Sequence, residues 1–267
     1  MSPYRVATLA SRIVVKVGSN VVLDADGRPA AERLRALVAS IAALRAAGRE
    51  VVLLTSGAVG LGRARPPGAG DGDRQACAAV GQARLTAFYH AEFARAGLDV
   101  AQLLLTEDDF RHAGRARRLA RTLDGLLAHG TVPVINENDA VSDAGTTFDG
   151  DLPVLFRDND MLATLVAKAT RASLVVLLSD VDGVYTADPA LEPSAALIPL
   201  VAFNETELRA TGASARGRGG MQAKLRAAER AVEAGIAVVI ANGHVPGLVE
   251  RIAAGEAVGT WFAGAGR

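Results

Sequence analysis

Residues 132–162 read VPVINENDAVSDAGTTFDGDLPVLFRDNDML, and this stretch organises the chain. It begins with an apolar run, Val132 to Ile135, that is too short for a helix and is typical of a buried strand. The strand is followed at once by amides and carboxylates, and a second polar cluster, residues 158–160, leads into an expected helix. Polar groups at the end of a buried strand are costly to desolvate, and open α/β sheets bind ligands beyond the carboxyl ends of their strands. The stretch is therefore predicted to form the substrate floor of an active site.

The rest of the chain alternates short β-branched runs with longer helical patterns. Further interior strands are predicted at residues 13–17, 51–54, 100–105, 174–178 and 238–241, with a small closing strand at 259–262. The expected helices are 29–47, 75–96, 114–129, 160–169, one ending at 234 and a short one after Gly247. Strand, helix and strand in this order indicate parallel pairing with right-handed crossovers. Trp261 is expected to be a packing residue.

Composition excludes several classes of protein. Half of the residues are hydrophobic, aromatics make up 4%, and the formal net charge is zero, so neither a nucleic-acid groove nor an anionic membrane surface is indicated. No apolar segment is long enough to span a bilayer and no signal peptide is evident. The single cysteine, Cys77, fits a reducing compartment and is interpreted as a small buried residue, and a cytoplasmic protein is expected. The four histidines are scattered without the spacing of a zinc site.

Three small motifs carry candidate chemistry. Lys16 lies inside an expected strand and precedes Gly18; it either meets an anionic ligand there or extends to water from an edge strand. Residues 55–58, TSGA, offer hydroxyls and backbone N–H groups at a strand end. The glycine-rich residues 217–220 lead into a helix that carries Lys224 one turn further on, which is typical of a phosphate cradle. Phosphoryl transfer between two anionic partners fits this set, because it needs positioning and charge neutralisation more than a nucleophile.

Two charged segments have competing interpretations. The acids at residues 107–109 are expected to stabilise the N-terminus of the next helix rather than to do chemistry. The arginines of the segment Arg115–Arg121 form either a solvated face or a contact to an anionic ligand or neighbouring subunit.

Taken in order, the motifs resemble those of the amino acid kinase family, in particular its members that phosphorylate glutamate. The segments that carry the resemblance are VVKVGSN, LLTSGAVGLG, RQACAAVGQARL, VPVINENDAV, RDND, LLSDVDGVYTADP and GRGGMQAKLRAA. It covers essentially the whole chain and implies a three-layer αβα sandwich around a mainly parallel sheet of roughly eight strands. It also implies transfer of a phosphoryl group from ATP, with Mg²⁺, to the γ-carboxylate of L-glutamate, the first step towards proline. Residues 1–267 are expected to form one kinase domain, with an amino-acid part followed by a nucleotide part and without the RNA-binding-like PUA domain of many members.

The resemblance also implies roles for individual residues. The catalytic set would be Lys16 and Lys224, on the transferring phosphoryl group, and Asp160, which holds both lysines. Glutamate would be bound by Ser56, Gly57, Asp139 and Asn159, with Asp139 facing the α-ammonium. The nucleotide would be bound by both lysines and by Gly18, Ser19, Ser179, Asp180, Arg218, Gly219, Gly220 and Met221. No metal ligand from the protein is assigned.

Some positions depart from the family pattern around the amino-acid pocket. The segment Ser142–Phe156 is longer than the usual link between the two acidic clusters, and Arg157 stands where a glycine is usual. These departures motivate an alternative, a kinase of a related amino acid in a specialised pathway. A second alternative, a non-catalytic ligand-binding domain of the same fold, is disfavoured by the joint presence of Lys16, Asp160 and Lys224. A homo-oligomer, dimer or tetramer, and feedback inhibition by proline are expected, with no nucleic-acid or membrane partner.

Overall fold

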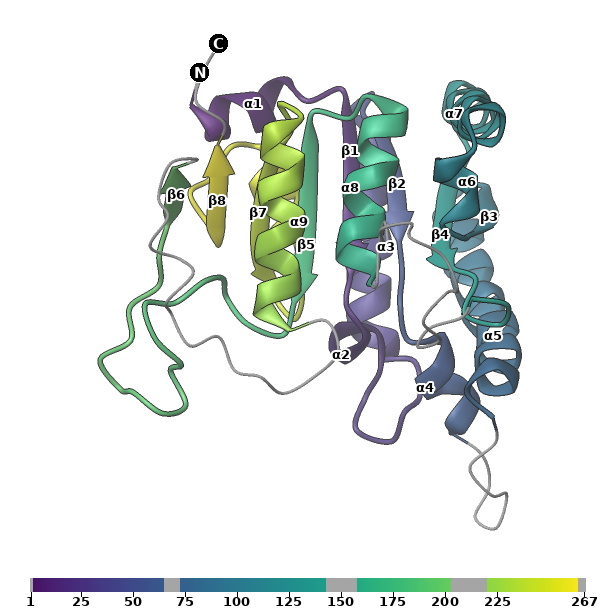
Figure 1. Cartoon of the computed structure of the whole chain (residues 1–267), viewed down its shortest axis with the longest axis horizontal. Helices are drawn as coiled ribbons and strands as arrows, with labels where there is room; N and C mark the ends of the chain where they lie inside the picture. The colour runs from purple at the N-terminus through teal and green to yellow at the C-terminus, as the bar shows by residue number, and fades with distance from the viewer. Residues whose placement is uncertain (1, 65–72, 143–157, 203–219, 264–267) are drawn as a thin grey trace.

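The computed structural model describes residues 2–64, 73–142, 158–202 and 220–263. Eight strands form one sheet in the order β3-β4-β2-β1-β5-β7-β8-β6 (Figure 1). The strands are β1 (Arg12–Val17), β2 (Glu50–Leu54), β3 (Val100–Leu105), β4 (Val132–Glu137), β5 (Leu174–Ser179), β6 (Leu200–Ala202), β7 (Ala237–Asn242) and β8 (Thr260–Ala263). All neighbouring pairs are parallel except β7 and β8, which run antiparallel. The expected mainly parallel, eight-stranded sheet is confirmed.

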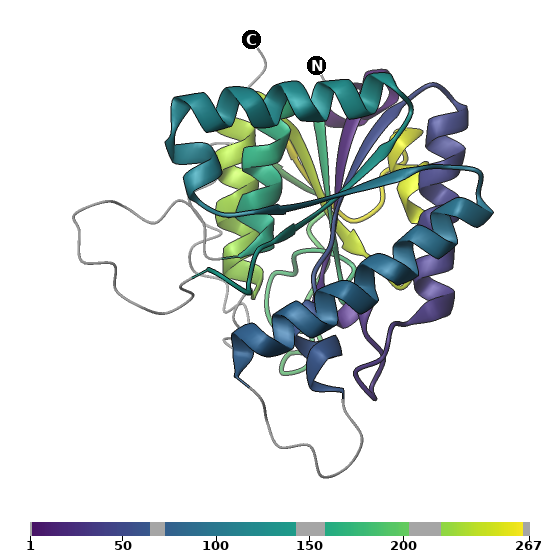
Figure 2. The same ribbon diagram turned by 90° about the vertical axis from the view of Figure 1, so that its right-hand side faces the viewer.

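Helices cover both faces of this sheet, which makes three layers (Figures 1 and 2). The helices are α1 (Pro3–Leu9), α2 (Ser19–Val22), α3 (Ala31–Ala46), α4 (Ala58–Arg63), α5 (Arg74–Arg95), α6 (Asp108–Arg111), α7 (Ala113–Ala128), α8 (Asn159–Thr170), α9 (Met221–Glu233) and α10 (Leu248–Ala253). Core residues of α1, α3, α5 and α10 pack on one face, and those of α7, α8 and α9 pack on the other. The interior strands are mostly apolar because both of their faces are covered, and the main exceptions, Lys16 of β1 and Asn136 of β4, lie near carboxyl ends.

Strand β1 shows how the two cores divide. Val15 belongs to the core under α3 and α5, whereas Val14 belongs to the core under α8 and α9. Side chains of a strand alternate between faces, so Lys16 shares the face of Val14. Because β1 pairs with β2 on one side and β5 on the other, Lys16 lies on a central strand. The interpretation of Lys16 as an edge-strand lysine is therefore wrong.

Most predicted elements are confirmed, with boundaries shifted by one or two residues. β4 continues through Asn136 and Glu137, so these two residues form the end of the strand rather than a turn after it. Ser19 opens the short helix α2, where a turn was expected. The helices α1, α4 and α6 and the strand β6 were not predicted. Trp261 is fully buried and Cys77 is 1% exposed, as expected for packing residues.

The parallel arrangement places the ends of six strands at one edge of the sheet. The carboxyl ends of β1, β2, β3, β4, β5 and β7 lie there, together with the first turns of α2, α4, α8 and α9 (Figure 1). This is the edge at which open α/β proteins bind their ligands.

Candidate active site

Two lysines from opposite ends of the chain meet one buried aspartate. Lys16 Nζ lies 2.7 Å from Asp160 Oδ1, and Lys224 Nζ lies 3.2 Å from Asp160 Oδ2. The three residues are 5%, 1% and 6% exposed, in the order Lys16, Asp160 and Lys224. In these direct contacts two cations share one carboxylate in a place that water hardly reaches, and the charges of Asp158 and Asp180 act on Lys16 and Lys224 as well.

The local sequence explains how Asp160 and Lys224 reach this position. Asp158 caps helix α8, because its carboxylate accepts hydrogen bonds from the backbone N–H groups of Asp160 and Met161, at 3.0 and 2.9 Å. Asp160 therefore sits in the first turn of α8. Thr164, one turn further, donates to the carbonyl of Ala227 at 3.0 Å and joins α8 to α9, which carries Lys224. The cap and this crossing hydrogen bond aim both side chains at the end of β1.

The charges of this cluster perturb one another. Burial alone would raise the pKa of Asp160, but the ammonium groups of Lys16 and Lys224 hold it below its usual range. Burial lowers the pKa of Lys16, and the neighbouring Lys224 lowers it further, while Asp160 opposes both. An anion bound next to Lys16 would favour its charged form.

A cluster of amides lies beside the charged cluster, at the ends of β2 and β4. Asn159 Nδ2 lies 2.9 Å from Ser56 Oγ, 3.0 Å from the carbonyl oxygen of Thr55 and 2.9 Å from Asn136 Oδ1. Asn136 is 1% exposed, and its own Nδ2 donates to Gln82 Oε1 on α5. The structure thus brings Ser56 and Asn159 together, as predicted for two groups of one pocket.

The turn before α4 requires glycine. Gly57 has φ +93°, in the left-handed region, and it follows Ser56 directly. Further along, a Cβ at Gly62 would lie 1.8 Å from the carbonyl oxygen of Cys77, and a Cβ at Gly81 would lie 1.8 Å from that of Ala58. The backbones of α4 and α5 are therefore in direct contact, which fixes the Ser56–Gly57 turn against α5.

Asp139 lies in the turn after β4 and is ion-paired with Arg74. Arg74 NH2 lies 2.7 Å from Asp139 Oδ1, and Asp139 is 13% exposed. Nearby, burial raises the pKa of Glu137 to about 7, and the negative charge of Asp139 raises it as well. Asp139 thus already has one cationic partner, and Glu137 changes its charge near neutral pH.

On the other side of the lysines, Ser179 and Asp180 close β5. Ser179 Oγ donates to Asp180 Oδ1 at 3.1 Å, and Asn20 Nδ2 donates to Asp180 Oδ2 at 2.7 Å. Burial would raise the pKa of Asp180, but the hydrogen bond from Asn20 and further contacts hold it below its usual range. Gly18 precedes α2, and a Cβ there would lie 3.7 Å from Lys16 Nζ. Gly220 and Met221 form the start of α9, whereas Arg218 and Gly219 lie outside the described residues.

The amino acid kinase family model matches residues 11–242. The chain belongs to the amino acid kinase family. Glutamate 5-kinase of Geobacter sulfurreducens is 42% identical over 260 residues, which are 94% of this chain and 67% of that protein. Glutamate 5-kinase of Symbiobacterium thermophilum is 42% identical over 258 residues, which are 94% of this chain and 95% of that protein. A tomato (Solanum lycopersicum) protein, delta-1-pyrroline-5-carboxylate synthase, is 42% identical over 269 residues, and the matched part is 37% of its length.

Solved structures support the same fold at lower identity. UMP kinase of Bacillus anthracis matches with a TM-score of 0.65 at 17% identity, covering 96% of this chain and 97% of that one. Isopentenyl phosphate kinase of T. acidophilum matches with a TM-score of 0.64 at 16% identity, covering 94% and 99%. The amino acid kinase fold expected from the motifs is confirmed.

Several residues of this amino acid kinase site were missing from the predicted set. Asn136 was seen only as part of a polar run, while Gln82, Arg74, Asn20 and Asp158 were given no role. The role of Asp158 could be predicted locally, because an aspartate directly before a helix with an acid in its first turn is typical of an N-cap. Gln82 and Arg74 had none, since their partners lie 54 and 65 residues away in the chain.

The described residues contain no group of three histidine, cysteine or acidic side chains that would hold a metal ion. None of the helices in the described part of the chain combines the length and apolarity that crossing a bilayer requires. The four arginines at positions 115, 117, 118 and 121 are exposed on α7, and Arg115 NH1 lies 3.8 Å from Asp108. Asp108 and Asp109 lie in the first turn of α6, as predicted for acids at a helix N-terminus. The segment Ser142–Phe156 and Arg157 lie, apart from Ser142, outside the described residues.

Proposed function

We propose that this chain transfers the γ-phosphoryl group of ATP to the γ-carboxylate of L-glutamate, giving L-glutamyl 5-phosphate for proline synthesis. The observation that carries the proposal is the buried contact of Lys16 and Lys224 with Asp160. The relatives named glutamate 5-kinase, 42% identical over 94% of the chain, point to glutamate as the acceptor.

The charged cluster suits this reaction because a phosphoryl group in transfer carries negative charge that must be stabilised. Preorganised cations in a site that excludes water stabilise such charge without reorganising during the reaction. In the proposal Lys16 and Lys224 contact the moving phosphoryl group, and Asp160 holds the two ammonium groups at the required separation. Asp160 cannot act as the acceptor itself, because both of its oxygens are occupied by lysines.

The amino acid is assigned to the ends of β2 and β4. Ser56 and Gly57 would bind its carboxylate, since the Ser56–Gly57 turn leads into the N-terminus of α4, and Asn159 would bind its N–H groups. Asp139 would bind the α-ammonium with the oxygen that Arg74 does not use. A free amino acid, with an ammonium and two carboxylates, matches this mixture of groups.

The nucleotide is assigned to the opposite side of the lysines. Gly18 and Ser19 would lie under its phosphates, with Gly220 and Met221 at the N-terminus of α9 and Ser179 and Asp180 at the end of β5; Arg218 and Gly219 would complete this loop. Glycine at position 18 suits a bound phosphate chain. A Cβ there would lie 3.7 Å from Lys16 Nζ and narrow the space beside the ammonium group. Mg²⁺ would arrive with ATP and neutralise phosphate oxygens, and Asp180 is the carboxylate of this group that could meet it.

Other expectations belong to the same proposal. We place the enzyme in the cytoplasm, as a dimer or tetramer, with proline acting as a feedback inhibitor at or near the glutamate pocket. The division into an amino-acid part and a nucleotide part follows the assignment above.

The experiment that tests the proposal supplies a panel of amino acids with ATP and Mg²⁺ and measures ADP release. Hydroxylamine in the same assay traps an acyl phosphate as the hydroxamate. We expect hydroxamate formation with L-glutamate. Turnover of another amino acid with none of glutamate would refute the assignment of the acceptor and support the alternative, a kinase of a related amino acid. No ADP release with any amino acid would support the second alternative, a non-catalytic ligand-binding domain of the same fold.

A further inference from the structure

Helix α5 presents polar side chains to the inside of the molecule on a face that is otherwise apolar. Leu85 and Phe93 are fully buried there, yet Gln82 and Tyr89 lie on the same face and are 9% and 1% exposed. Burying polar groups is costly unless each finds a partner, so their partners show what the helix is holding.

Gln82 begins a chain of hydrogen bonds that ends in the amino-acid pocket. Asn136 Nδ2 donates to Gln82 Oε1 at 2.8 Å. Asn136 Oδ1 in turn accepts from Asn159 Nδ2 at 2.9 Å and from the backbone N–H of Glu137 at 2.9 Å. On its other side, Gln82 Nε2 donates to Thr86 Oγ1 at 3.2 Å.

This chain has a direction. Because Gln82 offers an acceptor, Asn136 must turn its NH₂ group towards α5 and its carbonyl oxygen towards Asn159. That carbonyl oxygen then requires the NH₂ group of Asn159, which also faces Ser56 Oγ and the Thr55 carbonyl. The donors of Asn159 are thereby used within the protein. Its Oδ1 is buried and has no hydrogen-bond partner among the described residues, so it can accept an N–H from a ligand.

We infer that Gln82 is a positioning residue for the amino-acid acceptor, which it controls by fixing the orientation of Asn136 and, through it, of Asn159. The inference rests on the proposed function, because the acceptor is taken to carry an N–H donor. It identifies the acceptor class as compounds with an ammonium group next to the pocket amide. Glutarate has both carboxylates of glutamate and lacks that donor, so it should bind poorly to the wild-type protein.

The position of α5 makes this control rigid. The backbone contact between Gly81 and Ala58 fixes the helix one residue before Gln82, and a hydrogen bond of 3.0 Å joins Tyr89 to Thr55 at the end of β2. Gln82 therefore cannot move away from Asn136 without separating α5 from α4.

Three substitutions test the inference. Gln82→Met removes the acceptor at similar volume, Gln82→Glu keeps an acceptor at Oε1, and Thr86→Val removes only the other partner of Gln82. With Gln82→Met we expect the KM for the amino acid to rise about tenfold or more, because a buried donor of Asn136 loses its partner and the amides can reverse. The KM for ATP should change less than about twofold, and Gln82→Glu and Thr86→Val should stay within about threefold of the wild type. The preference for glutamate over glutarate should shrink in Gln82→Met alone.

A second readout does not depend on the reaction. Selective ¹⁵N labelling of asparagine, assigned with Asn136→Asp and Asn159→Asp, reports hydrogen exchange of the two side-chain NH₂ groups. We expect slow exchange of the Asn136 group in the wild type and in Gln82→Glu, and faster exchange in Gln82→Met. Unchanged exchange in Gln82→Met would overturn the inference, as would equal KM effects of Gln82→Met and Gln82→Glu. If the wild type phosphorylates no amino acid, the proposed function fails, and the exchange measurement still decides the role of Gln82.

Discussion

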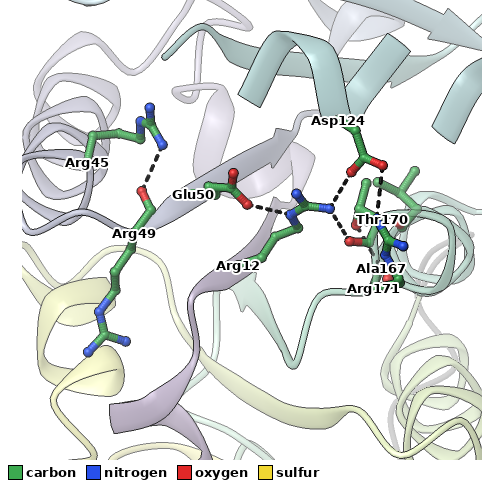
Figure 3. Close-up of polar contacts among 9 residues, drawn as sticks. Arg12, Arg45, Arg49, Glu50, Asp124, Ala167, Thr170 and Arg171 are labelled. Atoms are coloured by element: carbon green, nitrogen blue, oxygen red, sulfur yellow. Dashed lines mark hydrogen bonds and ion pairs between the residues drawn. The ribbon is translucent and has the colours of Figure 1, made fainter. Parts of the chain in front are cut away.

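Each end of strand β1 carries a cationic side chain that contacts helix α8. The two ends differ in how the charge of that side chain is neutralised. At the carboxyl end, Lys16 contacts Asp160 in the first turn of α8, and Asp160 is shared with Lys224. At the amino end, Arg12 contacts Glu50 and Asp124, each at 2.7 Å, and donates to the carbonyl of Thr170 in the last turn of α8 (Figure 3). Arg171 adds a second cation to Asp124, at 3.1 Å.

The two ends differ in burial and in the number of carboxylates that the cations contact directly. At the amino end two cations meet two carboxylates, so the direct contacts are balanced. At the carboxyl end two cations share one carboxylate, and both lysines are only 5% and 6% exposed. Cations preorganised in a buried place can stabilise the negative charge of a ligand without reorganising. The comparison predicts that substitutions at the two ends will separate activity from stability.

The largest effect is expected for Lys224→Met. Loss of one of two cations at the transferring phosphoryl group should raise the activation free energy by at least about 3 kcal/mol. The kcat should therefore fall roughly a hundredfold or more. Steady-state kinetics with ATP and the acceptor would measure it, with circular dichroism as a check on folding. An unchanged turnover would show that the charge of Lys224 is not catalytic.

Arg12→Met should show the opposite behaviour. The substitution leaves the buried parts of Glu50 and Asp124 with fewer partners, so the free energy of unfolding should fall by about 1–3 kcal/mol. The kcat of the folded enzyme at low temperature should stay near the wild-type value. Urea denaturation and kinetics on the same preparation measure both quantities. A large loss of kcat at full stability would break the distinction between the two ends.

Arg74→Met should act on binding of the amino acid. Arg74 is 37% exposed and fixes one oxygen of Asp139, so its loss should raise the KM for the amino acid about tenfold, with a smaller change in kcat. Arg74→Lys, which keeps the charge, serves as the matched variant and should retain most of the affinity. A lower KM in Arg74→Met would instead mean that Arg74 competes with the substrate ammonium for Asp139.

The smallest effect is expected for Glu137→Gln, and it depends on pH. The pKa of Glu137 is raised to about 7 from 4.5, so the folded state binds this proton more tightly than the unfolded chain. The contribution of Glu137 to the free energy of unfolding should therefore decrease as the pH rises from 4.5 to 7 and level off above that range. Glutamine does not titrate, so this pH-dependent contribution is absent from the variant. Between pH 5 and pH 8 the free energy of unfolding of the variant should rise relative to that of the wild type by on the order of 1 kcal/mol or less. Thermal denaturation at both pH values, with Glu32→Gln on the exposed face of α3 as a control, measures the difference.

The sequence predicted the charged cluster better than its surroundings. Lys16, Asp160 and Lys224 each have a local signal: a lysine in an apolar strand, a polar cluster before a helix and a glycine-rich turn. That Asp160 holds both lysines was implied by the resemblance to the amino acid kinase family. The sheet followed from its β-branched runs, since interior parallel strands are apolar on both faces. The pairing of Gln82 with Asn136 and of Arg74 with Asp139 depends on how α5 packs across the ends of β2 and β4. Such contacts between distant segments leave no periodic pattern in one sequence.

The backbone contact between α4 and α5 also limits how this pocket can change in evolution. A side chain at Gly62 or Gly81 would overlap backbone atoms at 1.8 Å, so the two helices cannot be spread apart by single substitutions that keep the fold. Adaptation to a longer or shorter acceptor must therefore occur through the side chains at Arg74 and residues 137–139, or through the length of the segment after Ser142. A family built on such a contact would diversify its substrates by loop insertion while its helices stay in register.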